Sequence, residues 1–479
     1  MEDKARVPPG LPLANPSISY WQDPPSDIAD LCSTPSLPSG TDYLIIGSGI
    51  SGASIAHNLL KRQPSASVVM LEARQASSGA TGRNGGHTKA ASYRSFLHHE
   101  QEYGIDEAVK IARLEYAVIR ETHELALELE IDCSSHPCDT VDIIYSEAAL
   151  RQGERAIARM REVMGAEDPA ARYDMFSAEE AREKFLTPEA LGAFRYEAGS
   201  VSAYRFTVGV LKACLAKGMN LQTNTPALAI SPASDAADGT PRWVVDTPKG
   251  KVETGNVVVA TNGYTAHLLP EMQGFIVPLR GQITAQRPAL GLPQRGLDTT
   301  YSFIYENGYE YMITRPASTP DAGMIIIGGG LGTLPEEGVA EFGNTDDGNL
   351  NADLSAYLTG CTQRYYGKNW GRDNEQGRVA KEWSGIMGTS ADGLPYVGGV
   401  EGKQGVWICA SFNGHGMVLC LKCGEALVDD MTSGKTKAWF PSALKMEGKR
   451  LERQFKGRLN LKAQPPGEGL FEDLQDGNS

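Results

Sequence analysis

The sequence has little cysteine, no long apolar run and no excess of positive charge. Eight cysteines in 479 residues are too few for a disulfide scaffold, so we expect reduced thiols and a cytoplasmic setting. With 45 basic against 59 acidic residues the net charge is −14, which disfavours nucleic acid and anionic lipid as partners. No apolar run approaches the ~18–20 residues of a membrane span, and the N-terminus lacks the apolar stretch of a secretory signal.

The chain is too long for one hydrophobic core, so we expect two domains or more. Residues 1–40 contain eight prolines and few periodic apolar positions, which predicts an extended arm anchored by Tyr20 and Trp21. Residues 436–479 are polar and charged, and we expect a docked or partly disordered tail there.

Between these ends, short apolar runs alternate with amphipathic segments. A strand over 43–46, a glycine turn, a helix over 51–62 and a strand over 68–71 form one βαβ unit. Strands over 301–305 and 309–315 flank Asn307-Gly308, a strong hairpin signal. Further helices are expected over 107–129, 146–163, 177–184, 205–217 and 417–431, and strands over 221–223, 243–246, 257–260 and 406–409.

Nucleotide-binding elements recur at both ends and in the middle of the chain, which implies discontinuous domains. We expect residues 41–95, 196–275 and 376–435 to form a cofactor-binding domain. Residues 96–195 and 276–375 would then form a substrate-binding domain.

The segment Gly47-Ser48-Gly49-Ile50-Ser51-Gly52 lies between the first strand and the first helix. Gly47 permits the tight turn, Gly49 lets the backbone approach a pyrophosphate, and Gly52 permits close helix packing. The positive end of the helix then faces the phosphates. Glu72 ends the second strand, 20 residues past Gly52, where a carboxylate can accept from ribose hydroxyls. The pattern predicts a dinucleotide site, and FAD and NAD share it.

A longer set of segments resembles a known family. Ser78-Gly79-Ala80-Thr81-Gly82-Arg83-Asn84-Gly85-Gly86-His87 resembles the flavin loop of the D-amino-acid-oxidase-like FAD-dependent oxidoreductases. Further similar segments are 260–264, 278–282, 328–330, 383–385, 391–395 and 414–417. The similarity covers roughly residues 40 to 435 and is nearest to the γ-glutamylputrescine oxidase branch, with glycine and sarcosine oxidases alongside.

The resemblance implies FAD, bound non-covalently or linked covalently at His87. It implies an α/β (α+β) fold with a Rossmann-like FAD-binding domain of the glutathione-reductase type and a discontinuous substrate domain on a mixed or antiparallel sheet. Asp392 would accept from ribityl or nearby hydroxyls, or serve as a turn aspartate. The cofactor-binding residues expected from the motifs are Gly47, Gly49, Ser51, Gly52, Glu72, Ala73, Arg74, Ser78, Thr81, Gly82, Arg83, Asn84, Gly85, Gly86, His87, Thr261, Asn262, Trp383, Asp392, Asn413, Gly414, His415, Gly416 and Met417.

The candidate catalytic residues are His87, Tyr311, Arg315 and His415. Strand alternation puts Tyr311 and Arg315 on one face, where glycine-oxidase-like members hold the substrate carboxylate with an arginine. Arg315 would bind a carboxylate or lie at the surface, and Tyr311 would be a gate, a donor or a core aromatic. His87 would be linked to the flavin, or be a non-covalent active-site or structural residue. His415 would be a base or structural.

The expected reaction is oxidation of a C–N bond in a small amine or amino acid by hydride transfer to flavin N5, followed by hydrolysis of the imine. O2 or another acceptor would take the electrons. No lysine lies between Lys251 and Lys368, where some family members carry one that promotes the reaction with O2, so direct use of O2 is in doubt. A flavin monooxygenase and a non-catalytic flavoprotein are the alternatives. We interpret Cys420 and Cys423 as buried small residues and expect no metal site.

Overall fold

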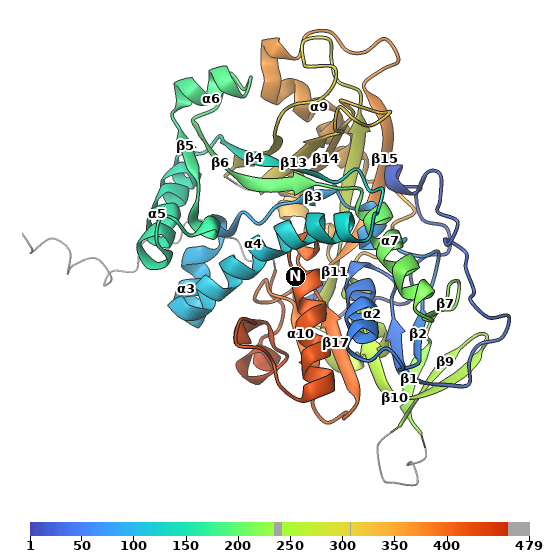
Figure 1. Ribbon diagram of the computed structural model, residues 1–479. Helices are drawn as coiled ribbons and strands as arrows, with labels where there is room; N and C mark the ends of the chain where they lie inside the picture. The colour runs from blue at the N-terminus through green and yellow to red at the C-terminus, as the bar shows by residue number, and fades with distance from the viewer. Residues whose placement is uncertain (234–241, 307, 458–479) are drawn as a thin grey trace, which may run out of the picture.

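Two β-sheets organise the chain, one in each half of the molecule (Figure 1). The computed structural model describes residues 1–233, 242–306 and 308–457. The first sheet consists of β1 (Gly40–Ile46), β2 (Val68–Leu71), β7 (Asn220–Gln222), β8 (Ala229–Pro232), β9 (Trp243–Thr247), β10 (Gly250–Val259), β16 (Tyr396–Gly399) and β17 (Val406–Ala410). The second sheet consists of β3 (His87–Thr88), β4 (His136–Ile144), β5 (Asp174–Phe176), β6 (Gly192–Ser200), β11 (Ile276–Gln286), β12 (Thr300–Tyr305), β13 (Gly308–Thr314), β14 (Ile325–Gly329) and β15 (Val379–Ser390).

The first sheet has a parallel centre in the order β17-β10-β1-β2-β7, with β16 and β9 added antiparallel. The second is antiparallel except where β12 runs parallel to β4. Two sheets of these types confirm the predicted α/β fold with a Rossmann-like part and a mixed second sheet. The helices are α1 (Glu2–Ala5), α2 (Ile50–Arg62), α3 (Phe96–Tyr103), α4 (Ile105–Glu128), α5 (Glu147–Met164), α6 (Ala178–Lys184), α7 (Ala203–Ala216), α8 (Thr265–Leu268), α9 (Ala352–Tyr366) and α10 (Cys420–Ser433).

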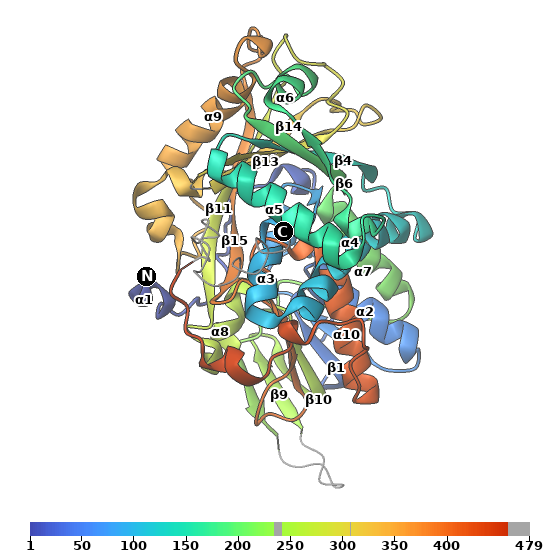
Figure 2. The same cartoon turned by 90° about the vertical axis from the view of Figure 1, so that its left-hand side faces the viewer.

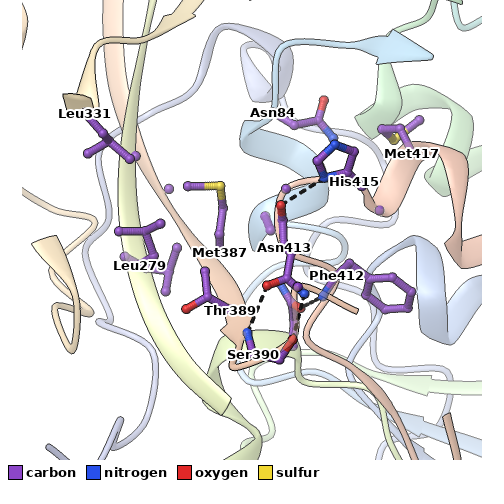
Figure 3. Close-up of a pocket in the computed structure, with 18 of the residues that line it drawn as sticks. Asn84, Leu279, Leu331, Met387, Thr389, Ser390, Phe412, Asn413, His415 and Met417 are labelled. Carbon is purple, nitrogen blue, oxygen red and sulfur yellow. Dashed lines mark hydrogen bonds between the residues drawn. The ribbon is translucent and has the colours of Figure 1, made fainter. Parts of the chain in front are cut away.

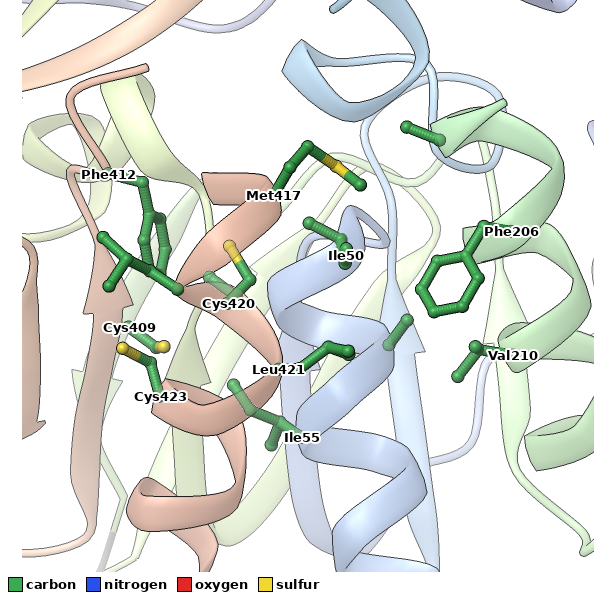
Figure 4. Close-up of a cluster of buried hydrophobic side chains, with 14 of the residues drawn as sticks. Ile50, Ile55, Phe206, Val210, Cys409, Phe412, Met417, Cys420, Leu421 and Cys423 are labelled. Atoms are coloured by element: carbon green, nitrogen blue, oxygen red, sulfur yellow. The ribbon is translucent and has the colours of Figure 1, made fainter. Parts of the chain in front are cut away.

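Helix α2 packs between α7 and α10 on one face of the first sheet. Figure 4 shows the apolar side chains at this contact, among them Ile55 and Leu421. The thiols of Cys409, Cys420 and Cys423 are free and buried in the same cluster, and burial raises the pKa of all three. These cysteines therefore act as packing residues. In the described parts of the chain, no group of three His, Cys, Asp or Glu residues could hold a metal ion.

Most elements with a clear apolar period lie where the sequence places them. Ser177 and Glu180 form the predicted capping box at the start of α6. β12 and β13 form the predicted hairpin, in which Tyr305 pairs with Gly308, while Asn307 lies outside the described residues. Sequence periodicity did not indicate α3, α9, β4, β6, β11 or β15. Strands such as β11, buried on both faces, carry little alternation.

Sheet membership differs from the predicted domain segments at three places. Residues 196–200 of β6 lie in the second sheet, although segment 196–275 assigns them to the cofactor-binding domain. β3 and β15 pair within the second sheet, although segments 41–95 and 376–435 assign them to the cofactor-binding domain. The long strands β11 and β15 of the second sheet pair with each other and run along the length of the molecule (Figure 2). The division into domains stays a prediction.

The N-terminal arm and the described part of the C-terminal segment pack onto the rest of the protein. Trp21 of the arm is buried and meets Tyr20 edge to face, with 5.3 Å between the ring centroids, so the predicted anchor is confirmed. Arg450 in the predicted tail is buried as well, whereas residues 458–479 lie outside the described part of the chain. No helix within the described ranges is long and apolar enough to cross a membrane.

Candidate active site

A cavity of about 1040 Å³ is bordered by residues of both sheets. This volume is at the upper end of the roughly 300–1,000 Å³ of a single small-molecule site, so it has room for a cofactor and a smaller molecule. Figure 3 shows part of its wall, where Met387 of β15 lies opposite His415 and Asn413. The predicted glycine turn, most of the flavin loop and the 413–417 turn all border this cavity.

The glycine turn has the shape that a bound pyrophosphate needs. Gly47 has φ +108°, and a Cβ there would lie 2.5 Å from the carbonyl oxygen of Ala260. A Cβ at Gly52 would lie 2.0 Å from the carbonyl oxygen of Gly47, so Gly52 shapes the turn without bordering the cavity. Gly49 and Ser51 do border it, at the N-terminus of α2.

The first turn of α2 leaves backbone donors at the cavity. The N–H of Ile50 donates to Thr81 Oγ1 at 3.0 Å, whereas those of Ser51 and Gly52 have no acceptor among the described residues. The Ser51 hydroxyl donates away from the cavity, to the carbonyl of Cys409 at 3.2 Å. Free N–H groups at a helix start attract anions, so the site fits a phosphate-bearing cofactor.

Glu72 lies at the end of β2, half-buried at the cavity edge beside Ala73. Its Oε2 accepts from the Ser48 N–H at 3.0 Å, and its Oε1 from the Arg74 N–H at 3.0 Å. The carboxylate is thereby oriented, as a ribose ligand requires. Arg74 also borders the cavity, and its Nη1 forms an ion pair with Asp347 Oδ2 at 3.0 Å.

The flavin loop, residues 78–87, borders the cavity through Gly79, Ala80, Thr81, Arg83, Asn84, Gly85 and His87; Ser78, Gly82 and Gly86 do not border it. A Cβ at Gly85 would lie 2.5 Å from Tyr311 Cε2. Only glycine permits this approach, and Tyr311 borders the cavity. Burial lowers the pKa of Arg83 to about 10, and its Nη1 donates to the carbonyl of Ser384 at 2.9 Å.

The turn between β17 and α10 is held by two asparagine side chains. Asn262 Oδ1 accepts from the N–H groups of Ser411 at 3.0 Å and Phe412 at 3.1 Å. Asn413 Oδ1 accepts from the Ser390 N–H at 2.9 Å (Figure 3). Asn262 and Asn413 both have positive φ, which asparagine tolerates better than most residues.

This turn presents backbone donors to the cavity. The N–H groups of Gly416 and Met417 open a short 3₁₀ turn (Gly416–Val418) and have no acceptor in the described part of the chain. Gly414 and Thr261 border the cavity beside them. His415 Nδ1 lies 3.1 Å from the carbonyl oxygen of Asn413, which fixes the ring at the cavity wall.

Asp392 and Trp383 have structural partners instead of the expected cofactor contacts. Both Asp392 carboxylate oxygens accept from Arg450, at 2.6 and 3.1 Å, and this guanidinium holds the pKa of Asp392 below its usual range. Asp392 borders the cavity, whereas Arg450 does not. The Trp383 indole lies outside the cavity and donates to the carbonyl of Arg83 at 2.8 Å, so it supports the flavin loop from behind.

Arg315 does not border the cavity, against the sequence prediction. Its Nε lies 3.0 Å from Asp321 Oδ2, its Nη2 donates to Ser134 Oγ at 3.0 Å, and its guanidinium carbon is 5.2 Å from the centre of the Trp21 ring. Alternation correctly indicates the face of β13, but Arg315 follows the last strand residue, Thr314, beyond the cavity.

His87 borders the cavity, and one nitrogen of its ring already has hydrogen-bond partners within the protein. Its Nε2 is hydrogen-bonded to Thr300 Oγ1, and Thr140 Oγ1 lies 3.4 Å away. Burial holds the pKa of His87 well below its usual range, so the ring is neutral at physiological pH. Covalent attachment of flavin at His87 stays a prediction.

A buried polar cluster that the sequence did not indicate forms another part of the wall. Asp142 Oδ2 accepts from Arg94 Nη2 at 2.7 Å and from the hydroxyls of Tyr93 at 2.7 Å and Tyr196 at 3.1 Å. Its other oxygen accepts from Lys89, which also donates to Ser302. Lys89, Tyr93, Arg94 and Ser302 border the cavity.

The cluster has two cations against one carboxylate. Asp142 has the pKa of its carboxyl lowered by Arg94 and Lys89, against its burial, and it is ionised. Burial lowers the pKa of Lys89 to about 7. Arg94 has its guanidinium carbon 4.6 Å from the centre of the Tyr309 ring and keeps its charge. Below the pKa of Lys89 this cluster therefore carries one net positive charge, which falls to about half a charge at pH 7.

One cavity, large enough for a cofactor, is bordered by the glycine turn at one part and by Lys89 and Arg94 of the charged cluster at another. Such a cavity is typical of a dinucleotide-dependent enzyme. The family described as FAD dependent oxidoreductase matches residues 42–430, and the chain belongs to it. FAD is accordingly its cofactor, and the glycine turn, the oriented Glu72 and the free N–H groups fit that group.

Individual relatives are more distant. A tRNA 5-methylaminomethyl-2-thiouridine biosynthesis bifunctional protein of Thiobacillus denitrificans is 26% identical over 396 residues, 81% of this chain and 56% of that protein. The chain thus spans about half the length of that relative. The γ-glutamylputrescine oxidoreductase of Escherichia coli is 21% identical, with 82% and 84% covered. The glycine oxidase structure of Geobacillus kaustophilus superposes with a TM-score of 0.66 at 21% identity, covering 85% of this chain and 99% of that one.

Proposed function

We propose that this protein uses FAD to oxidise the C–N bond of a small amine or amino acid that carries a carboxylate. The observation that carries the proposal is the net positive charge of the Lys89–Arg94–Asp142 cluster in the cavity wall. A buried excess of positive charge is costly unless an anion balances it, so the cluster favours an anionic ligand.

Arg94 is the better placed of the two cations to hold a carboxylate. Nε and Nη2 are directed to Asp142, whereas Nη1 has no acceptor among the described residues and can donate to a ligand. The Tyr309 ring covers the guanidinium and restrains its plane. Lys89 adds charge at the same wall through its contact with Ser302.

The bound FAD supplies a two-electron acceptor to the substrate carbon beside the nitrogen. The chain's own residues then bind and orient the substrate. Tyr311, packed against Gly85 of the flavin loop, borders the space in which the substrate would lie. The substrate amine reacts in its neutral form, so no strong base is needed. The positive charge of Lys89 and Arg94 disfavours a protonated amine beside them.

The relatives support an amino compound as the substrate class. The names of two of them, a γ-glutamylputrescine oxidoreductase and a glycine oxidase, describe oxidation of amines or amino acids. Both are similar to this chain at low identity, so the particular substrate is left to experiment.

The proposal is tested by anaerobic mixing of the FAD-loaded protein with amino acids, N-substituted amino acids and simple amines. We expect the visible flavin band to bleach with at least one carboxylate-bearing amine and a carbonyl product to form in equal amount. Bleaching by NADPH alone, with no amine effective, would support a monooxygenase instead.

A further inference from the structure

Two indole rings hold consecutive carbonyl groups of the flavin loop. Trp383 Nε1 donates to the carbonyl of Arg83 at 2.8 Å, and Trp21 Nε1 donates to that of Asn84 at 2.6 Å. Trp21 belongs to the N-terminal arm and Trp383 to β15, so segments far apart in the sequence fix one short stretch of backbone. Ser19 of the arm adds a third such bond, from its Oγ to the carbonyl of Gly82 at 2.6 Å.

The indoles lie behind the loop, outside the cavity, while Asn84 and Gly85 border it. In a trans peptide the C=O of one residue and the N–H of the next point in opposite directions. With both carbonyls directed at the indoles, the N–H groups of Asn84 and Gly85 point away from them, toward the cavity side. Neither N–H has an acceptor among the described residues.

Trp21 is itself fixed from two sides. Its ring packs on the loop, because a Cβ built on Gly86 would lie 3.1 Å from Trp21 Cζ2. On the other side lies the guanidinium of Arg315, at 5.2 Å from the ring centre and held by Asp321 and Ser134. A buried arginine that touches the tryptophan and not the cavity has no direct contact with a ligand.

We propose that Trp21 and Arg315 are positioning residues for the flavin ring. Arg315 holds the Trp21 ring, and Trp21 holds the Asn84 carbonyl. The N–H groups of Asn84 and Gly85 are thereby fixed as a pair of donors for acceptor atoms of the flavin ring. The inference rests on FAD in this cavity and is independent of which substrate is oxidised.

The test compares W21F, R315A and R315K with two matched controls. Arg378 also stacks on a tryptophan, with its guanidinium carbon 5.1 Å from the Trp370 ring, and neither residue borders the cavity, so R378A controls for loss of such a pair. Trp407 Nε1 donates to Asn256 at 3.3 Å outside the cavity, so W407F controls for loss of an indole donor.

Each holoenzyme is measured for its visible flavin spectrum, FAD release on dilution, thermal midpoint and binding of anthranilate, a small carboxylate. W21F and R315A should shift the flavin band and release FAD about 3- to 10-fold more readily, the range of one lost hydrogen bond. R315K should resemble wild type, since a cation remains over the ring. R378A and W407F should leave the spectrum unchanged, and anthranilate affinity should stay the same in all FAD-saturated variants.

A native spectrum and native FAD retention in W21F would overturn the proposal, and W21F decides the matter even if R315A fails to fold. R315A with a native spectrum but weakened anthranilate binding would mean that Arg315 contacts the substrate. Loss of amine oxidation with the spectral pattern intact would count against the proposed function and leave this inference standing.

Discussion

The guanidinium of Arg94 donates two hydrogen bonds to one oxygen of Asp142, from Nη2 at 2.7 Å and from Nε at 3.2 Å. The other oxygen of Asp142 is taken by Lys89. One buried carboxylate thus holds two cations in the wall of the cavity. The positive charge that Asp142 does not balance would attract an anionic substrate.

Asp142→Asn should destabilise the protein by about 3–5 kcal/mol, because it leaves two buried cations without their carboxylate. The thermal midpoint measures the loss. The matched control is Asp139→Asn on the same strand, whose side chain is 45% exposed and should tolerate the change. Adding Lys89→Met to Asp142→Asn should restore part of the stability; no recovery would show that the charges are not coupled.

Binding of a small carboxylate should weaken as the pH rises through about 7, the pKa to which burial lowers Lys89. Below that pH Lys89 is charged and the cluster is positive; above it the cluster approaches neutrality. A bound anion favours the charged lysine, so binding takes up a proton. Anthranilate titrations of the flavin spectrum from about pH 6 to about 9, where a carboxylate stays ionised, measure the effect. Lys89→Met should bind weakly at every pH, and an equally steep dependence in that variant would contradict the assignment.

Gly52→Ala should abolish FAD binding, because its Cβ would lie 2.0 Å from the carbonyl oxygen of Gly47 and would displace the turn. Gly360→Ala is the control: this glycine of α9 lies outside the cavity and has nothing within 4 Å of a built Cβ. Flavin absorbance per protein after gel filtration distinguishes them. If folded Gly52→Ala retained stoichiometric FAD, the assignment of the glycine turn to the cofactor site would be wrong.

Arg450→Met should lower the thermal midpoint, because it leaves the buried carboxylate of Asp392 without its cation. The expected loss in the free energy of unfolding is about 3–5 kcal/mol. Arg450 lowers the pKa of Asp392. The stability gained from the pair is therefore present above the ordinary aspartate pKa and lost as the pH falls through the lowered one. Arg453→Ala, which breaks a partly exposed pair with Glu102, should have a small effect. Equal effects of the two substitutions would contradict a structural role for the Asp392–Arg450 pair.

Local signals in the sequence indicated the glycine turn and Glu72. Gly47 to Gly52 and Glu72 act through neighbouring backbone, and their spacing determines where they lie. The substrate side depends on pairings between distant strands, which spacing does not encode. Arg315 shares the predicted face of β13 but lies past the end of the strand. Arg94 is held at the cavity by its hydrogen bonds to Asp142 on β4. A single aspartate within the apolar run Val141 to Ile144 was the one available sign of a buried charge.

The proposed function is tested most directly by flavin reduction with an amino acid and with its carboxamide, in wild type and in Arg94→Ala. Arg195, which is half-buried and paired with Asp174 outside the cavity, provides the control variant Arg195→Ala. In wild type the acid should react far better than the amide. Arg94→Ala should lose about 2–5 kcal/mol of transition-state stabilisation with the acid and almost none with the amide. An unchanged preference for the acid in Arg94→Ala would contradict the assignment of the carboxylate to this cluster.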